Sequence, residues 1–353
     1  MWFKNLQLYR LASPFPLALA QLEEQLGRVV FTRCGSQDKQ SRGWVPPRGK
    51  LEKADKDAAS AALPLVHSVG GQWLIAMATE HRLLPSSVVN QVAADRADEL
   101  EAQQGFRPGR KQLRELKERV TEELLPRAFT RRSTTWLWLD PVNGWLAVDA
   151  ASRGKADDAL ELLAKSLDDF PVKPIKTERS PTSAMADWLA AGEAPAGFTV
   201  DRDCELKAVS DEKSTVRYVR HALDTDEVQA QVRTHLEAGK LPTRLALTWG
   251  DRLSFVLTEK LEIKRLAHLD TKEEEANEAN GANGDELFDA EFALMSGELQ
   301  RFLPDLLEAL GGEIRDGEGA SAEAAAGATA AAKPASPTQA PAPAATADDD
   351  PPF

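Results

Sequence analysis

Residues 134–149 read TTWLWLDPVNGWLAVD, and this stretch decides the fold class. Two apolar runs rich in Trp, Leu and Val flank Pro141-Val-Asn-Gly144, and short apolar runs bounded by turn residues are typical of β-strands. The Asn-Gly pair supplies the positive φ that a tight turn needs. The stretch therefore predicts a β-hairpin with strands at 134–140 and 145–149.

Outward from the hairpin, strand-like and helix-like segments follow one another in no regular order. Residues 2–10 and 72–79 are strand-rich, and a three-stranded meander is predicted at 245–249, 252–258 and 261–266, with turns at Gly250-Asp251 and Glu259-Lys260. Apolar residues at helical spacing predict helices at 155–169, 225–238 and 288–310, the last kinked or restarted at Pro304. This mixture predicts an α+β fold without regular βαβ alternation.

A pair of helices is predicted between the strands at 72–79 and 134–140. Ser86 or Ser87 is the expected N-cap of a first helix that runs to residue 104 without a breaker. Gly105-Phe-Arg-Pro-Gly109 interrupts it, and a second helix runs over 110–125. Helices joined by so tight a turn form an antiparallel hairpin. We call residues 84–131 the finger, because we expect them to project from the sheet.

The second finger helix separates its side chains into stripes, as helical periodicity allows. The apolar stripe consists of Leu113, Leu116, Val120 and Leu124, and the basic stripe beside it of Arg110, Arg114 and Lys117. Residues 105–132 hold nine basic and four acidic side chains, so the finger is locally positive.

The net charge of −13 comes from other parts of the chain. Of the 353 residues, 1–269 hold 39 Lys and Arg against 37 Asp and Glu, while 270–291 and 316–353 together hold fifteen acids and two lysines. We expect residues 270–284 to be a solvated loop and the acidic, Ala- and Pro-rich residues 316–353 to be a disordered tail. The net charge is therefore weak evidence about what the folded body binds.

No local signature of catalysis is found in the sequence: it lacks Gly-x-Gly-x-x-Gly, the P-loop, His-Glu-x-x-His and Gly-x-Ser-x-Gly. Cys34, which follows Arg33, is a candidate nucleophile, but a small packing residue before a turn is the favoured interpretation. The scattered histidines and two cysteines predict no metal site, and we expect no cofactor. Residues 43–49, GWVPPRG, are interpreted as a rigid loop with an aromatic anchor, either packed or in contact with a ligand.

No apolar run approaches the roughly 20 residues that a membrane span needs. The first ten residues lack the basic start and apolar stretch of a signal peptide. We therefore expect a cytoplasmic protein with no membrane partner.

The basic residues of the finger are segregated from its acidic residues and continue beyond the second helix. Exposed charged faces are often only solvated, but this segregation is also the footprint of a protein that binds nucleic-acid phosphates. No zinc finger, helix-turn-helix or ribonucleoprotein motif supports base-specific reading. The candidate DNA contacts from this pattern are Arg110, Arg114, Lys117, Arg127, Arg131 and Arg132.

Nine short motifs follow one another in order over nearly all of residues 1–315. They are Trp2-Phe-Lys-Asn-Leu6, Cys34-Gly-Ser-Gln-Asp38, Gly43-Trp-Val-Pro-Pro47, Leu124-Leu-Pro-Arg-Ala-Phe129, Val142-Asn-Gly144, Leu236-Glu-Ala-Gly-Lys240, Leu245-Ala-Leu, Lys264-Arg-Leu266 and Phe288-Asp-Ala-Glu-Phe. A chain that carries them strongly resembles the RdgC family of bacterial recombination-associated proteins.

The resemblance implies a non-enzymatic, nucleoid-associated protein that binds double-stranded DNA without marked sequence preference and restrains RecA-type recombinase. It also implies a horseshoe-shaped protomer that closes as a homodimer into a ring around the duplex. The implied parts are a central α+β domain with the β-sheet region (1–83 and 132–183), the finger at the tip (84–131), a basal α+β domain (184–315) and the tail (316–353).

The resemblance also carries roles to individual residues. Phe129 falls at the family's aromatic contact between two fingers, with a core aromatic at the root of the finger as the alternative. Arg220 and His221 fall at the second, basal dimer contact, where the family has a Lys-Gln pair. Arg107, Arg110 and Lys111 match the family's basic stretch near the turn of the finger approximately, which adds Arg107 and Lys111 to the candidate DNA contacts.

Two other classes of function stay open. A protein-interaction module would engage a basic partner through the acidic loop and tail, with any DNA contact incidental. A nuclease or phosphotransferase would need ligands scattered along the chain. Salt-dependent DNA binding distinguishes the first class from a DNA-binding protein, and metal-dependent cleavage would identify the second.

Overall fold

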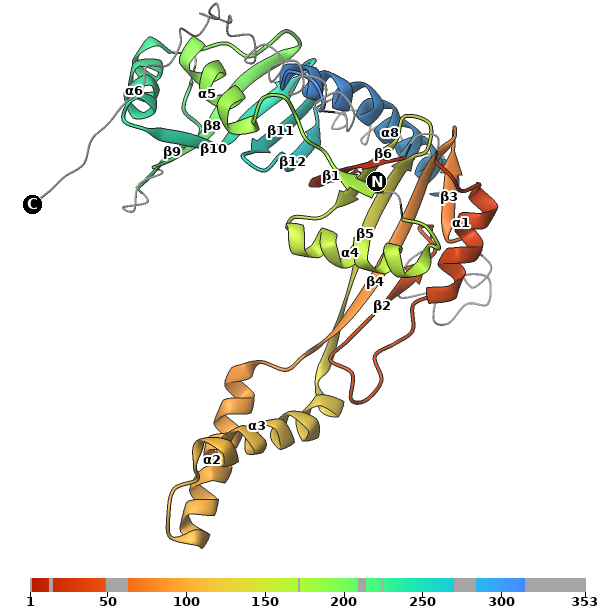
Figure 1. The fold of residues 1–353 in the computed structure, drawn as a ribbon, viewed down its shortest axis with the longest axis vertical. Coiled ribbons are helices and arrows are strands. Elements are labelled where there is room, and N and C mark those ends of the chain that lie inside the picture. Colours follow the sequence, from red (N-terminus) through yellow and green to blue (C-terminus); the bar gives the residue numbers. More distant parts are fainter. Residues whose placement is uncertain are drawn as a thin grey trace, which may run out of the picture. The chain divides into compact units, whose positions relative to one another are not determined.

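The twelve strands of the structure form one antiparallel sheet (Figure 1). The computed structural model describes residues 2–12, 15–48, 63–170, 172–208, 214–223, 225–269 and 284–314. In these residues it has twelve strands and seven α-helices, which confirms the predicted α+β class. The predicted tail, and the predicted acidic loop up to residue 283, lie outside the described residues.

The strands are β1 (Leu6–Leu11), β2 (Gln40–Val45), β3 (Val66–Val69), β4 (Gln72–Leu83), β5 (Phe129–Asp140), β6 (Trp145–Asp149), β7 (Val172–Pro174), β8 (Phe198–Ala208), β9 (Thr215–Tyr218), β10 (Lys240–Trp249), β11 (Leu253–Thr258) and β12 (Ile263–His268). The helices are α1 (Leu19–Leu26), α2 (Ser86–Gln104), α3 (Arg110–Leu124), α4 (Arg153–Ser166), α5 (Pro181–Ala191), α6 (Asp226–Glu237) and α8 (Gly284–Ala309). The order across the sheet is β2-β4-β5-β6-β1-β12-β11-β10-β8-β9, and β3 and β7 pair with β4 and β1.

The predicted hairpin is confirmed as β5 and β6, which pair antiparallel from Leu137↔Val148 to Asp140↔Trp145. Gly144 takes a left-handed φ of 71°, as the Asn-Gly signal requires. The Asp140 carboxylate accepts hydrogen bonds from the backbone N–H groups of Val142 and Asn143, so the turn is held from within.

The apolar run of β5 is continuous because both faces of this half of the sheet are covered. Leu137 and Leu139 belong to a core with α1 and α4, whereas Trp138 belongs to a second core with α5, α6 and α8. All three side chains are fully buried. Alternating side chains of one strand therefore fill two separate cores, and no polar face interrupts the pattern.

The predicted meander is confirmed as β10, β11 and β12, which pair antiparallel in sequence order. Gly250 and Asp251 both have positive φ, as expected of the first turn, whereas the left-handed residue of the second turn is Leu261, after Glu259-Lys260. Helix α8 runs without interruption through Pro304, so of the two outcomes predicted there, a kink or a restart, the restart is wrong.

The loop predicted at residues 43–49 is wrong for its first three residues, which lie in β2. Trp44 is fully buried, and its indole N–H donates to Ser166 Oγ at 2.7 Å. A Cβ on Gly43 would lie 2.3 Å from the Phe31 Cα, so glycine is needed there for close packing of two backbones. The two prolines that follow suggested a loop, and they mark only the end of the strand.

The two halves of the sheet meet at β1. On one side β1 pairs with β6 over five residues, and on the other it pairs with β12 through a single Cα pair, Leu6↔Ile263. One further backbone bond, from Leu266 N–H to Lys4 C=O, crosses the same seam. Side-chain packing must therefore hold the halves together.

Helix α8 supplies much of that packing. Its 26 residues give it a length of about 39 Å. At one end Phe288 packs edge-to-face on His67 beside β4, and further along Phe302 packs on Trp249 of β10. Between them Gln300 donates to the buried Asp140 carboxylate at 2.7 Å. One helix thus contacts strands from both halves of the sheet.

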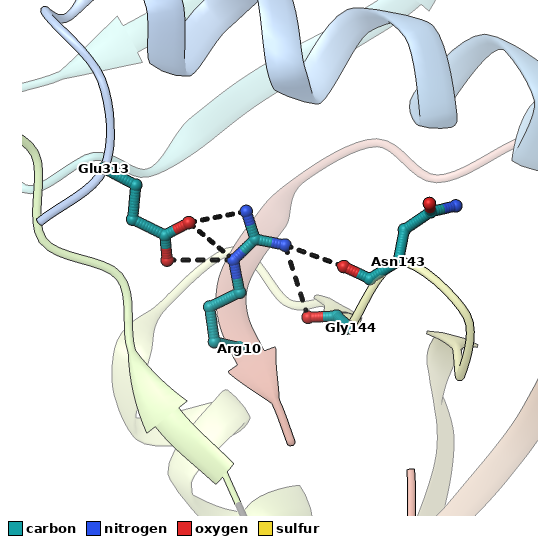
Figure 2. A network of polar contacts seen from close by, with 4 residues as sticks. All are labelled: Arg10, Asn143, Gly144 and Glu313. Atoms are coloured by element: carbon teal, nitrogen blue, oxygen red, sulfur yellow. Dashed lines mark hydrogen bonds and ion pairs between the residues drawn. The ribbon is translucent and has the colours of Figure 1, made fainter. Parts of the chain in front are cut away.

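A network of polar contacts around Arg10 of β1 holds Glu313, which lies near the C-terminal end of the described residues (Figure 2). The Arg10 guanidinium donates to both carboxylate oxygens of Glu313 at 2.6–2.8 Å and to the Asn143 carbonyl at 3.0 Å. Its carbon also lies 3.6 Å from the centre of the Trp145 ring. Both charged side chains are mostly buried, so this pair is worth more than a surface ion pair.

Among the helices that the structure describes, none is long and apolar enough to cross a membrane.

We predict that Arg10→Ala lowers the free energy of unfolding by about 2 kcal/mol, because it removes a bidentate ion pair and a cation–π contact and leaves Glu313 buried without its cation. Urea denaturation at neutral pH measures this. Arg28→Ala is the matched control, since the Arg28–Asp168 pair is bidentate but exposed, and it should leave stability unchanged. Equal effects of the two substitutions would contradict the role given to Arg10.

Candidate nucleic-acid interface

The finger is inserted between β4 and β5 (Figure 1). It has a small hydrophobic core of its own. Val89, Ala93 and Ala97 of α2 pack against Leu116 and Val120 of α3. Leu113 and Leu124 lie at the margin of this core, so the predicted apolar stripe is confirmed. The finger is therefore held together by its own helix–helix contact, while its attachment to the sheet depends on the strands that lead to it.

The first finger helix begins differently from the prediction. Helix α2 starts at Ser86 with Pro85 as its N-cap, and no side chain caps it. The two serines lie in the first turn, so the expected serine cap is wrong; Pro85 already holds the extended φ and ψ that a residue before a helix needs. At the other end Gly105 adopts a left-handed φ of 77° and closes the helix, as its sequence position indicates.

The candidate DNA contacts of the finger are exposed to solvent. Those on the turn and on α3 are Arg107, Arg110, Lys111, Arg114 and Lys117, and those at the root of the finger are Arg127 and Arg131. Arg114 is 83% exposed and forms an i,i+4 ion pair with Glu118. Because an exposed pair of this kind is weak, a phosphate can replace Glu118 with little loss of free energy. The structure thus brings five cations together along one helix and its preceding turn.

Arg132 is placed differently from the other candidates. Its guanidinium donates to Glu80 Oε1 at 2.8 Å, and Glu80 is 3% exposed. The other carboxylate oxygen of Glu80 accepts from the Cys34 backbone N–H at 2.7 Å. Burial raises the pKa of Glu80, but the hydrogen bonds from Arg132 and Cys34 outweigh it and hold the pKa below its ordinary value. Arg132 therefore has a structural role at the root of the finger.

Arg82 also lies at this root, and like Glu80 it was not predicted from the sequence. Its guanidinium donates to the carbonyls of Leu125, Pro126 and Ala128 at 3.2–3.3 Å, and to the Gly35 carbonyl at 3.0 Å. These carbonyls belong to the turn where the finger rejoins the sheet and to a loop from the N-terminal part of the chain. We call Arg82, Glu80 and Arg132 the root clamp. No local pattern marks Arg82, because its partners are carbonyls more than forty residues away in the sequence.

Phe129 is 83% exposed, so the alternative that placed it in the core is wrong. It begins β5 and is the Cα partner of Leu83, the last residue of β4, which is itself 50% exposed. Two large apolar side chains therefore face solvent at the point where the finger leaves the sheet. The dimer contact assigned to Phe129 stays a prediction.

Arg220 and His221 lie just after β9, at the edge of the sheet, and both are exposed. Arg220 has a left-handed φ of 57°, and its backbone N–H donates to Asp203 Oδ1 at 2.9 Å. The His221 ring packs edge-to-face against Tyr218. This turn is held in place by β8 and β9, and the basal dimer contact assigned to it stays a prediction.

The candidate nucleophile Cys34 is placed for packing. Burial and the charge of Glu80 raise the pKa of the Cys34 thiol, whose Sγ donates to the Glu80 carbonyl at 3.2 Å. Burial raises the pKa of Cys204 to about 12. Neither thiol is thus in the thiolate form that nucleophilic attack requires at neutral pH. In the described part of the chain, no group of three or more His, Cys, Asp or Glu residues could hold a metal ion.

Comparison with known proteins points to one family. The family model described as "Putative exonuclease, RdgC" matches residues 1–313. A recombination-associated protein RdgC of Dechloromonas aromatica (strain RCB) is 60% identical over 314 residues, which are 89% of this chain and 99% of that protein. Those of Janthinobacterium sp. (strain Marseille) and Herminiimonas arsenicoxydans are each 50% identical, again over 89% of this chain and 99% of theirs.

An α+β protein with a helical finger that matches these relatives along nearly their whole length falls in the recombination-associated class. The chain belongs to the RdgC family. The family description and the names of the relatives differ, since one refers to an exonuclease and the others to recombination, and neither name establishes an activity.

We predict that Glu80→Gln lowers the free energy of unfolding by about 2 kcal/mol at neutral pH, because it removes the buried carboxylate charge that pairs with Arg132. The pKa of Glu80 is lowered from 4.5 by folding, so its stabilising effect is complete above that pH and is lost as the pH falls through the lower folded value. Wild type and variant should therefore converge in acid, which urea denaturation across a pH series measures. Glu161→Gln, at an exposed ion pair, is the control and should change little at any pH.

Proposed function

We propose that this protein binds double-stranded DNA without marked sequence preference and has no enzymatic activity of its own. The observation that carries the proposal is the charge of the finger: residues 102–114 contain four exposed cations and no acid. A row of exposed cations on one rigid element suits a row of phosphates, which every DNA sequence presents at the same spacing.

The acidic net charge of the chain is compatible with this proposal. Surface charges more than about 10 Å apart are largely screened at moderate ionic strength, so a phosphate near the finger responds to local cations. Acidic segments elsewhere discourage DNA from adsorbing to other surfaces. Electrostatic attraction is thus concentrated on the finger.

We further propose, from the family resemblance, that two protomers close a ring around the duplex. The finger-to-finger contact would use Phe129, and the basal contact would use Arg220 and His221. The exposure of Phe129 supports this, because a solvated aromatic side chain gains about 1.5–3 kcal/mol when a partner covers it. A ring on nucleoid DNA in the cytoplasm would restrain RecA-type recombinase by occupying the duplex on which its filament grows.

The description of the family as an exonuclease makes nuclease activity the second candidate function. Its test is direct: incubation of the protein with linear duplex and Mg²⁺ or Mn²⁺ should leave the DNA intact. Release of nucleotides that stops on chelation of the metal would replace our proposal.

We predict that Arg110→Glu combined with Lys117→Glu weakens DNA binding and its salt dependence. If each protomer contacts about four phosphates, a dimer should give a slope of log K against log salt of about −6 to −8. The double substitution should make the slope less steep by about 3 to 4. Arg114 is left in place because it pairs with Glu118.

The control for this prediction is Arg153→Glu combined with Lys176→Glu, which changes net charge equally at exposed residues outside the finger. Fluorescence anisotropy with a labelled duplex at several salt concentrations measures both. Equal weakening by the control would show that net charge, and not the finger, governs binding.

We predict that Phe129→Ser leaves a folded dimer but shortens its residence on closed circular duplex. An apolar contact at a small interface can supply about 2 kcal/mol, so its loss should open the finger-to-finger contact while the basal contact persists. Dissociation from linear duplex, where the ring can also leave over an end, should change much less. Dissociation rates on closed circles and on linear fragments at one salt concentration test this. Unchanged rates on both would reject Phe129 as the gate.

A further inference from the structure

Phe106 is a second exposed aromatic residue on the finger, and packing in a hydrophobic core does not account for its presence there. It is 61% exposed and does not belong to the cluster that joins α2 and α3. It lies in the turn between these helices, at the far end of the finger from Phe129 along the chain. An exposed phenyl ring on such a turn costs solvation free energy that a partner would recover.

The backbone of the turn that carries Phe106 is held at both of its ends. On one side the Gly105 N–H donates to the Glu101 carbonyl at 2.9 Å, with Gly105 in the left-handed conformation. On the other side the Gly109 N–H donates to Gln112 Oε1 at 3.0 Å. Pro108, between them, is buried. Both ends of the turn are therefore hydrogen-bonded to a helix.

The charges around Phe106 indicate the chemistry of its partner. Arg107, Arg110 and Lys111 are its exposed basic neighbours along the chain, and the nearest acids along the chain are Glu101 and Glu115. A partner that offers only apolar surface would leave these cations without counter-charges. Nucleic acid offers both a phosphate for the cations and the flat face of a base for the ring.

The form of the nucleic acid follows from where base faces are accessible. In an intact duplex every base is stacked, and insertion of a side chain costs a few kcal/mol per step. At a gap, flap or overhang an unpaired base has a free face, and stacking on an aromatic side chain contributes about 1–3 kcal/mol per base. The unpaired base is therefore the better ligand.

We propose that Phe106 stacks on an unpaired base, so that the turn of the finger recognises gaps and single-stranded junctions in duplex DNA. This rests on the proposed DNA binding and adds a preference that a purely electrostatic finger would lack. The cations hold the backbone on either side of the junction, and the phenyl ring distinguishes an unpaired base from a paired one.

Two probes test the proposal: an intact duplex with hairpin-capped ends, and the same duplex with a short gap that contains 2-aminopurine. Phe106→Ala should lower affinity for the gapped duplex about tenfold and leave affinity for the intact duplex within about twofold. Phe106→Trp should keep the preference for the gap. Val30→Ala, at an apolar residue that is 50% exposed elsewhere, should change neither affinity. The quenching of 2-aminopurine by wild type should disappear with Phe106→Ala only.

The possible failures can be told apart. If Phe106→Ala lowers both affinities equally or lowers neither, the stacking role is wrong while the proposed DNA binding stands. If Phe106→Ala changes the oligomeric state of the protein in solution, Phe106 contacts another protomer and the proposal is also wrong. If wild type binds neither probe, the proposed function and this inference fail together.

Discussion

The seam between β1 and β12 is the constraint on which the rest of the structure depends. A sheet of twelve strands is continuous only if β1 bonds to both halves, yet the bond to β12 consists of one Cα pair and one adjacent backbone hydrogen bond. Contacts between side chains hold the two halves of the sheet together. Helix α8 contacts both halves, and the Arg10–Glu313 pair fixes the chain that leaves α8 against β1. The fully buried Leu6 lies at the junction itself.

Local chemistry predicted the fold well at the hairpin, the meander and the second finger helix, although it placed the cap of α2 and the loop at residues 43–49 wrongly. The Asn-Gly hairpin, the meander and the apolar stripe of α3 all depend on residues within a few positions of one another, and all are confirmed. Where a residue's partner is distant in the sequence, the sequence alone did not predict the full extent of a strand. β4 and β5 continue to Leu83 and Phe129 because they pair with each other, which polar residues such as Arg131 concealed.

The candidate site shows the same division between local and distant causes. Helical spacing was sufficient to expect that the basic stripe of α3 faces solvent, since the apolar stripe fixes which side packs. It could not separate Arg131, which is exposed, from Arg132, which is held by a glutamate fifty-two residues away. Arg82 was missed for the same reason. A cation that binds backbone carbonyls has no signature in sequence, because every residue type supplies a carbonyl.

The finger leaves and re-enters the sheet through Leu83 and Phe129, which are Cα partners in the register of β4 and β5. Because the chain returns to the point at which it left, the sheet and the root clamp constrain the root of the finger but not the two helices and the turn beyond it. The finger can gain or lose helical turns, exchange its charges or alter its turn while the ladder below keeps its pairing. The length of the finger and its preference for a ligand can therefore change in evolution without affecting how the sheet folds. Divergence within such proteins should accumulate at the finger turn sooner than in the strands that carry it.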